Sequence, residues 1–216
     1  MFIFLEIIKK MKINKIIKSY PIIGDALEFI INTSDSNFNP YHNLNHNLTV
    51  MYFSYQLGIS ENLSKQEMTE LLLAAIFHDY NHSGGKEKDD YNIKEAKKGV
   101  VNFISKYDVK IDKNRIYRII DATEFPYKIK DENLTLQQEI IRDADMLQLI
   151  EDNRIQTNII GLQTELKRSY SEHLKLQKEF MENLKLRLKA SKKLQDKFFP
   201  DIIEELNLLV KFDKKK

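Results

Sequence analysis

Two pairs of histidines, each pair spaced four residues apart, are the side chains with the clearest chemical potential in this 216-residue sequence. His42 and His46 lie in "NPYHNLNHNLTVMYF", and His78 and His82 lie in "AAIFHDYNHSGG". On a helix, side chains four residues apart stand on the same face, about 5–6 Å apart at Cβ. The members of each pair can therefore act together on one ion or one substrate.

Carboxylates accompany these histidines. Asp79 follows His78 directly, and "IIRDADMLQLI" carries Asp143 and Asp145 within an apolar helical pattern. Asp145 borders the buried stripe, where a carboxylate is costly to bury without a cation or hydrogen-bond partners. Imidazole with carboxylate suits Zn, Mn, Fe or Mg rather than a thiophilic metal. Because one such histidine pair often arises by chance, it is the combination that predicts a metal site.

The fifth histidine, His173, lies in the charged stretch "LKRSYSEHLKLQKE". Charge on both sides of it predicts a surface residue outside the metal site. The chain has no cysteine, which excludes disulfides, thiolate metal sites and cysteine nucleophiles. The absence of cysteine is compatible with a reducing compartment, and we expect the cytoplasm.

The positioning elements are expected to be helices. The chain has 6 glycines, against about 15 at average usage for this length, and only 4 prolines. Few helix breakers mean few turns and long helices, and apolar residues recur at helical spacing in "LLLAAIF". Ser64, Asp112 and Thr135 are suitable N-caps. The sequence predicts an all-α fold with helices near residues 2–18, 22–32, 43–57, 65–80, 90–106, 113–124, 135–152, 162–197 and 201–210.

We expect a single domain over residues 1–216, with a motif core near 37–150 and C-terminal helices over 151–216. The 34 basic and 32 acidic residues are interleaved, so no nucleic-acid partner is expected. The N-terminal "MFIFLEIIKKMKINKII" contains charges after its apolar start and no cleavage site, unlike a signal peptide. It is also shorter than the roughly 20 apolar residues of a membrane span. An amphipathic opening helix is expected.

The histidine motifs resemble those of a known superfamily. The order His46, His78-Asp79, Asp145 is similar to the HD-domain metal-dependent phosphohydrolases. "YHNLNHNLTV" followed by "HDYNHSGG" resembles the catalytic domain of class I 3′,5′-cyclic nucleotide phosphodiesterases, which carry Y-H-N-x-x-H-x-x-x-V and then H-D-x-x-H-P-G. Ser83 stands where the family has proline, and Gly84 keeps the glycine. "DATEFPY" and "ADML" are similar to the family's A-T-D and A-D-L segments.

The resemblance implies a single helical phosphohydrolase domain, shorter than is usual for the family, that binds two divalent ions (Zn, Mn, Mg or Fe). It implies that the first ion is held by four residues: His46, His78, Asp79 and Asp145. Asp79 would also reach the second ion, His42 would be the general acid, and His82 would order water.

The resemblance further implies contacts with a small-molecule nucleotide substrate. Tyr41 and Asn43 are expected near the pocket. The family holds the base with glutamine followed three residues later by phenylalanine, and "QKEF" offers Gln177 and Phe180 at that spacing. These two residues are the candidates for base binding, although they follow the last metal ligand more closely than in the family.

The leading expectation is a metal-dependent phosphodiesterase that opens a cyclic nucleotide or a related cyclic phosphodiester to a linear monophosphate. An HD-type hydrolase of nucleotide monoesters or triphosphates is the alternative enzyme, but it would not need the Y-H-N opening. A non-catalytic, metal-stabilised helical module is the second alternative, but it would not need both His42 and His82. The metal, the base, the exact substrate and the oligomeric state stay open.

Overall fold

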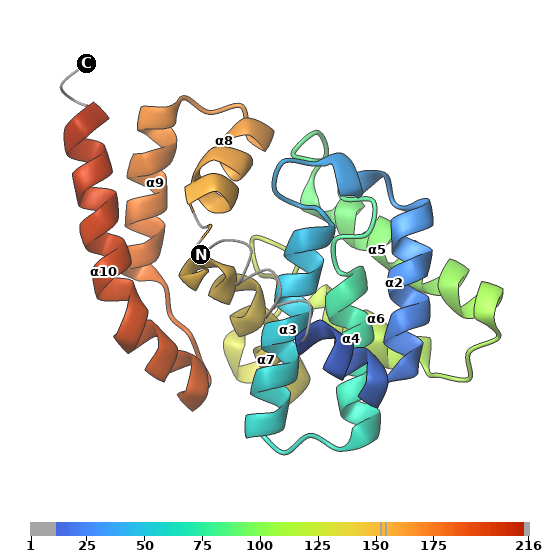
Figure 1. Cartoon of the computed structure of the whole chain (residues 1–216). Helices are drawn as coiled ribbons and strands as arrows, with labels where there is room; N and C mark the ends of the chain where they lie inside the picture. The colour runs from blue at the N-terminus through green and yellow to red at the C-terminus, as the bar shows by residue number, and fades with distance from the viewer. Residues whose placement is uncertain (1–11, 152, 154, 214–216) are drawn as a thin grey trace.

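The computed structural model describes residues 12–213 except 152 and 154, and it confirms the all-α fold. Within those residues the chain forms helices and no strand (Figure 1). Residues 12–19 are helical. The elements that follow are α2 (Pro21–Thr33), η1 (Asp35–Phe38), α3 (Leu44–Ser60), α4 (Lys65–Phe77), α5 (Asp89–Tyr107), α6 (Lys113–Asp121), η2 (Asp131–Asn133), α7 (Leu136–Met146), η3 (Leu147–Ile150), η4 (Ile155–Gly161), α8 (Leu162–Glu165), α9 (Tyr170–Asn183) and α10 (Lys189–Asp213).

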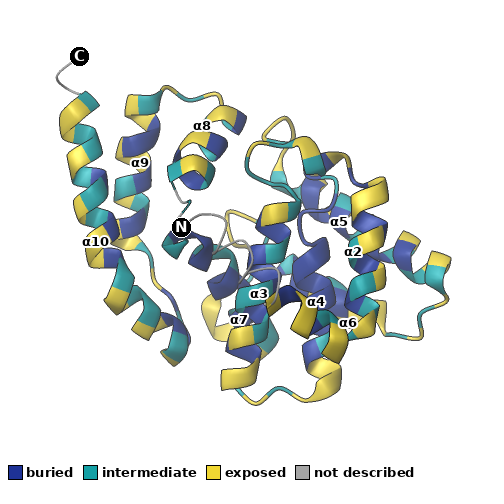
Figure 2. Cartoon of the chain, in the orientation of Figure 1, coloured by how far each residue is buried: buried dark blue, intermediate teal, exposed yellow. Residues whose placement is uncertain are grey.

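Helix α4 lies at the centre of the bundle. It packs against α3 and α6, and α3 also packs against α7. Apart from Thr69, every residue of α4 from Met68 to Phe77 has its side chain buried or nearly so, which fits a helix enclosed by neighbours (Figure 2). The antiparallel-looking pair α9 and α10 lies beside this bundle, and η4 with α8 connects the two parts (Figure 1). This arrangement leaves the ends of α3, α4 and α7 facing α8 and α9.

Local sequence signals explain where the central helices begin. Ser64 and Thr135 form capping boxes with Glu67 and Gln138, as the sequence predicts for Ser64 and Thr135. The side chain of Asp112 accepts a hydrogen bond from the backbone N–H of Asn114 at the start of α6. These caps satisfy backbone donors that helix geometry leaves unpaired.

Aromatic packing fixes α4 against its neighbours. Phe77 at the end of α4 has its ring centroid 6.1 Å from that of Phe29 in α2 and 5.4 Å from that of Phe103 in α5. Tyr80, just after α4, stacks on Phe29 at 5.9 Å. A Cβ on Gly99 would lie 2.5 Å from Tyr80 Cδ1, so only glycine allows α5 to approach this ring. The turn after α4 is thereby held firmly by the core.

The C-terminal helices differ from those predicted. The single helix expected over 162–197 is wrong, because α8 ends at Glu165, Lys167 adopts a left-handed φ of 51°, and Ser169 caps a new helix. A second break separates α9 from α10. The break expected before residue 201 is also wrong, since α10 continues through Pro200. Pro200 is exposed, so water can satisfy the carbonyl that proline leaves without a donor.

Other boundaries shift by a few residues. The helix expected over 65–80 ends at Phe77, and the one expected over 135–152 changes to a 3-10 turn after Met146. Residues 1–11 of the expected opening helix lie outside the described residues. None of the described helices is long and apolar enough to cross a bilayer.

Candidate metal centre and active-site cavity

Four side chains converge where α3, α4 and α7 meet, and we call them the metal cluster: His46, His78, Asp79 and Asp145. The Nε2 atom of His46 lies 3.1 Å from Asp145 Oδ1 and 3.2 Å from Asp79 Oδ2. The Nε2 atom of His78 lies 3.2 Å from both Asp79 Oδ2 and His46 Nε2, and 4.0 Å from Asp145 Oδ1. Segments almost 100 residues apart in the chain thus meet at one point.

Helix ends place these groups. His46 lies in the first turn of α3, whose N-cap is Asn43, and the Asn43 side chain accepts hydrogen bonds from the backbone N–H groups of Asn45 and His46. His78 is the C-cap of α4, and Asp79 follows in the turn. Asp145 lies in the last turn of α7. Short, capped helix ends therefore aim all four side chains into one space.

Hydrogen bonds fix the orientation of both histidine rings. The Nδ1–H of His78 donates to the carbonyl of Ala75 at 2.8 Å, and that of His46 donates to the side-chain Oε1 of Gln148. In the neutral rings both Nε2 atoms then present lone pairs, only 3.2 Å apart. Two facing lone pairs repel each other unless a cation or a proton lies between them. Gln148 was not identified from the sequence, where its only signal is its position three residues after Asp145.

The charges of the cluster point to the same need for a cation. Burial by itself lowers the pKa of His46, but hydrogen bonds and charge from Asp145 and Asp79 outweigh it and raise this pKa to about 10. Burial raises the pKa of Asp145, yet the hydrogen bond and charge of His46 bring it below its usual value. Without a metal, a proton on His46 takes the place of the positive charge that the two carboxylates require.

The residues fit a divalent metal ion. His46, His78 and Asp145 offer ligand atoms that all lie within 4.8 Å of one another. Ligands about 2.0–2.2 Å from one ion lie roughly 3–4 Å from each other, as these atoms do. When the two imidazoles are neutral and unprotonated at Nε2, the buried Asp79 Oδ2 has no hydrogen-bond donor among the described residues. An orphaned carboxylate oxygen beside two imidazole lone pairs is the donor set of a Zn, Mn or Fe site.

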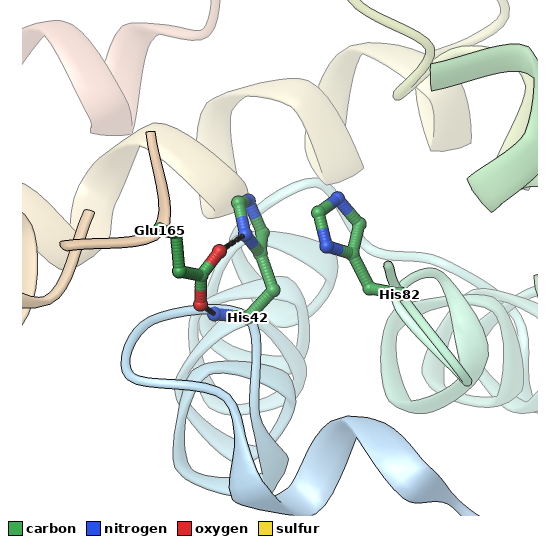
Figure 3. Close-up of side chains that lie close together, drawn as sticks. All are labelled: His42, His82 and Glu165. Atoms are coloured by element: carbon green, nitrogen blue, oxygen red, sulfur yellow. Dashed lines mark hydrogen bonds and ion pairs between the residues drawn. The ribbon is translucent and has the colours of Figure 1, made fainter. Parts of the chain in front are cut away.

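A second cluster, the acid cluster, lies next to the first and consists of His42, His82 and Glu165 (Figure 3). Glu165 Oε2 lies 2.5 Å from His42 Nδ1, while Oε1 accepts the backbone N–H groups of Tyr41 and His42 at 2.6 and 2.8 Å. Burial raises the pKa of Glu165, but the hydrogen bond and charge of His42 outweigh it and lower that pKa. The carboxylate is thus charged and directed at His42.

His82 completes the acid cluster. Its ring stacks on that of His42 with centroids 3.7 Å apart, so that His42 lies between Glu165 and His82 (Figure 3). The backbone N–H of Gly84 donates to His82 Nδ1 at 3.1 Å, and His82 Nε2 lies 2.9 Å from the side-chain Nδ2 of Asn92. Burial and the charge of His42 lower the pKa of His82 to about 4, so the ring is neutral near pH 7.

Two glycines bring His82 and Glu165 together. Gly84 and Gly85 have φ values of 62° and 76°, which residues with a side chain rarely adopt. A Cβ on Gly85 would lie 2.8 Å from the backbone carbonyl of Glu165. The loop after His82 therefore touches α8 directly. This contact explains why "SGG" follows the histidine motif.

Glu165 was missed in the sequence analysis. It lies in "LQTELKR", where a charged residue in a helical stretch resembles an ordinary surface position. The only local signal is its spacing from Leu162 and Leu166, which line the cavity. Its task depends on a contact across 123 positions of sequence, which no local pattern reveals.

All four members of the metal cluster, together with His42 and His82 of the acid cluster, line one cavity of about 520 Å³. Its described walls carry four carboxylates, Asp79, Glu87, Asp89 and Asp145, against Arg168 as the one lysine or arginine. An anionic ligand would be repelled by such a wall unless bound cations reverse the charge. The cavity is therefore suited to a phosphate-bearing ligand only together with metal ions.

The remaining predicted residues are distributed as follows. Tyr41, Gln177 and Phe180 line the cavity, and the Tyr41 ring centroid lies 4.6 Å from that of His42. Asn43 is not among the cavity-lining residues, because its amide is used to cap α3 and to donate to the Asn39 carbonyl at 2.8 Å. In this structure the Asn43 side chain positions the helix end that carries His46.

The surface position predicted for His173 is wrong. His173 is 1% exposed, lines the cavity, and contacts the carbonyl of Asn158 through Nε2 at 3.1 Å. The charges that surround it in sequence lie on the other face of α9, where Glu172 and Lys175 are exposed. An amphipathic helix separates neighbours in this way.

Comparison with known proteins supports the resemblance over part of the chain. Residues 41–106 match the family described as 3′5′-cyclic nucleotide phosphodiesterase. Over 50 residues the chain is 40% identical to the dual specificity calcium/calmodulin-dependent 3′,5′-cyclic nucleotide phosphodiesterase 1C of Mus musculus, covering 21% of this chain and 7% of that protein. The Homo sapiens protein of the same name matches equally. The match thus spans a small fraction of these relatives' length.

No solved structure matches this chain. The family match covers both histidine pairs and Asp79, whereas Asp145, Glu165 and the walls around Gln177 lie beyond it. The predicted resemblance to cyclic nucleotide phosphodiesterases is confirmed for this motif segment.

Proposed function

We propose that this protein is a metal-dependent phosphodiesterase that hydrolyses a cyclic nucleotide, or a related cyclic phosphodiester, to a linear monophosphate. The observation that carries the proposal is the meeting of a metal cluster with a His42–Glu165 pair in one cavity. The segment that supplies His42, His46, His78 and Asp79 is the one that matches 3′5′-cyclic nucleotide phosphodiesterases. Metal ligands and a proton donor are the two components that phosphodiester cleavage requires.

The metal cluster would hold the first of two divalent ions through His46, His78, Asp79 and Asp145, with Asp79 shared with the second. When bound, such ions supply a nucleophilic hydroxide near neutral pH and neutralise charge on the phosphoryl oxygens. Gln148 and the Ala75 carbonyl hold the two imidazole rings with Nε2 directed inwards. The protein thereby contributes a preformed ligand geometry.

His42 would act as the general acid. Its Nδ1 is held by the charged Glu165, so the ring is oriented. Water provides the oxygen that becomes bonded to phosphorus, the ester P–O bond breaks, and the departing oxygen takes a proton from His42 Nε2. Protonation removes the need to expel an alkoxide, which is a poor leaving group.

His82 would have a supporting role in the same step. Because it is neutral, it adds no positive charge beside the His42 ring that stacks on it. It is close enough to the metal cluster to order water in the cavity. Gln177 and Phe180 would hold the base at the α9 wall.

A substrate panel tests the proposal. Purified protein loaded with Mn²⁺ is assayed with cyclic mononucleotides, cyclic dinucleotides, and nucleoside monophosphates and triphosphates. We expect hydrolysis of a cyclic substrate that is abolished by a chelator and restored by metal. Hydrolysis of monoesters or triphosphates alone would replace the proposal with the alternative enzyme class. Stoichiometric metal binding without hydrolysis of any substrate would favour a binding module.

A further inference from the structure

One wall of the cavity carries polar side chains that the reaction does not use. Asn158 from η4 and His173 from α9 are 2% and 1% exposed, and both line the cavity together with Gln177. His173 and Gln177 are four residues apart on α9 and so lie on the same face. We call Asn158 and His173 the acceptor pair, for the reason that follows.

The hydrogen bond of His173 decides which ring nitrogen carries its proton. Its Nε2 contacts the backbone carbonyl of Asn158 at 3.1 Å, and a carbonyl can only accept. Burial lowers the pKa of His173, so the ring is neutral and carries its proton on Nε2. Its Nδ1 is therefore an acceptor, and it is buried without a partner among the described residues.

The amide of Asn158 is oriented in the same way. Its Nδ2 donates to the backbone carbonyl of Gln148 at 3.4 Å, so its Oδ1 is the free end. Oδ1 is also buried and without a partner in the described part of the chain. Each of these two wall residues thus keeps one fixed acceptor atom to which the described residues supply no donor. Buried polar atoms are nearly always paired, and such exceptions call for a ligand or a water molecule.

The surroundings indicate a flat ligand. Phe180, Leu149 and Leu162 line the same cavity and provide apolar surface next to the acceptor pair. Apolar surface with a few fixed polar atoms is the usual composition of a site for a heteroaromatic ring. A ring that binds here would have to supply N–H donors to the two acceptors.

We propose that Asn158 and His173 recognise an exocyclic amino group on the base of the substrate. The inference rests on the proposed function and deepens it, because it names the chemistry of the preferred base. Adenine and guanine carry such a group, whereas hypoxanthine and unsubstituted purine do not. The acceptor pair is fixed by its own hydrogen bonds.

The first test uses the wild-type chain loaded with Mn²⁺ and two matched substrate pairs. Cyclic AMP is compared with the cyclic phosphate of purine riboside, and cyclic GMP with cyclic IMP. In each pair the second compound lacks only the amino group. We expect kcat/KM to favour the amino compound at least about tenfold in one pair, which also identifies the base. A ratio near one in both pairs overturns the inference, and this measurement requires no variant.

The second test asks whether the acceptor pair causes the preference. His173→Phe and Asn158→Leu should each bring the ratio towards one, whereas Lys175→Ala on the exposed face of α9 should keep it. Because the readout is a ratio of two substrates, a general loss of activity does not imitate the effect. Both variants keeping the wild-type ratio would overturn the inference.

A substrate without a base separates the two proposals. Hydrolysis of bis(p-nitrophenyl) phosphate by the wild-type chain reports the metal centre alone. If this diester is cleaved and the amino preference is absent, only the acceptor pair is refuted. If neither this diester nor any cyclic nucleotide is cleaved, the proposed function fails, and the inference fails with it.

Discussion

The carboxylate of Glu165 lies 2.5 Å from the imidazole Nδ1 of His42, across 123 positions of sequence. The same carboxylate also accepts the backbone N–H groups of Tyr41 and His42, so it holds the ring and the backbone that carries it. The orientation of the proposed acid therefore depends on a helix that follows the last metal ligand in the chain.

Replacing Glu165 with glutamine should impair turnover without loss of metal. The amide keeps the size of the side chain but removes the negative charge that faces His42 Nδ1. We expect kcat on a cyclic nucleotide to fall about 10²-fold or more. Metal content, measured by elemental analysis, should equal that of the wild-type protein. Glu172→Gln, on the exposed face of α9, is the control, and a loss of metal from Glu165→Gln would contradict a role confined to His42.

Substitutions of His42 and His46 should have different effects on metal content and on turnover. His42→Ala should keep its metal and lose about 10²–10⁴-fold on a cyclic nucleotide, the range for general acid catalysis. It should lose far less on bis(p-nitrophenyl) phosphate, whose leaving group needs no proton. His46→Ala should lose metal and both activities. Equal fractional losses on the two substrates for His42→Ala would show that it is not the acid.

Of the two aspartates in "DAD", Asp145 should be needed for metal binding and Asp143 for the stability of the fold. Asp145 lies 3.1 Å from His46 Nε2, whereas Asp143 accepts the backbone N–H groups of Arg187 and Leu188 at 3.1 and 2.9 Å. Asp145→Ala should abolish metal binding. Asp143→Ala should retain metal but lower the free energy of unfolding by about 1–3 kcal/mol, because a buried and a partly buried backbone N–H lose their acceptor. The reverse pattern in metal analysis and denaturant unfolding would mean that the ligand assignment is wrong.

The metal-free protein should lose stability as the pH rises. The pKa of His46 is raised from 6.5 to about 10 in the folded protein. A group with a raised pKa stabilises the fold fully below its unfolded pKa, and the contribution is lost as the pH climbs to its folded pKa. Chelator-treated protein should therefore show a falling melting temperature between pH 6.5 and about 10.

Metal should reverse this trend, because the ion replaces the proton at the cluster and binds better when the ligands are deprotonated. The melting temperature with excess Mn²⁺ should hold or rise over the same pH range. His46→Leu, treated with chelator, is the control and should lack the fall. Identical pH curves with chelator and with metal would contradict an ion at this cluster.

Gln148 should matter for metal affinity although it is not a ligand. Gln148→Leu removes the acceptor for His46 Nδ1–H and should weaken Mn²⁺ binding by about 10–100-fold, as is typical for groups that orient a ligand. Gln148→Glu keeps an acceptor oxygen and should restore most of the affinity. Titration calorimetry on metal-free protein measures both, and equal affinity in the leucine variant and the wild type would remove Gln148 from the centre.

The sequence predicted those parts of the molecule that local patterns determine. The capping residues, the central helices and the two histidine pairs are short-range signals, and the all-α fold follows from them. The helix boundaries of the C-terminal half were predicted less well. The breaks around Lys167 and between α9 and α10 were not predicted, although Ser169 is a local N-cap signal for α9, and the helix through Pro200 is tolerated where Pro200 is exposed.

The missed residues share one property. Glu165 and Gln148 act through partners 123 and 102 positions away, and Asn158 through partners 10 and 15 positions away on other helical elements, so their immediate neighbours give no sign of these contacts. His173 was misassigned because its charged neighbours mask the single buried face of α9. Residues of this kind are recognised only when the folded chain brings the two partners together.

The division of the site between two parts of the chain has a consequence for partly folded states. The proposed metal ligands come from α3, the end of α4 and α7, while Glu165 and the acceptor pair come from α8, α9 and η4, which meet the rest at contacts that include Gly85. Elements with separate packing can open separately, each with its own free energy. A molecule in which only the C-terminal helices have opened would still carry its ions but would have no oriented acid. Metal retention and catalytic competence are thus distinct properties of this fold, and an ion-loaded population is not by itself an active one.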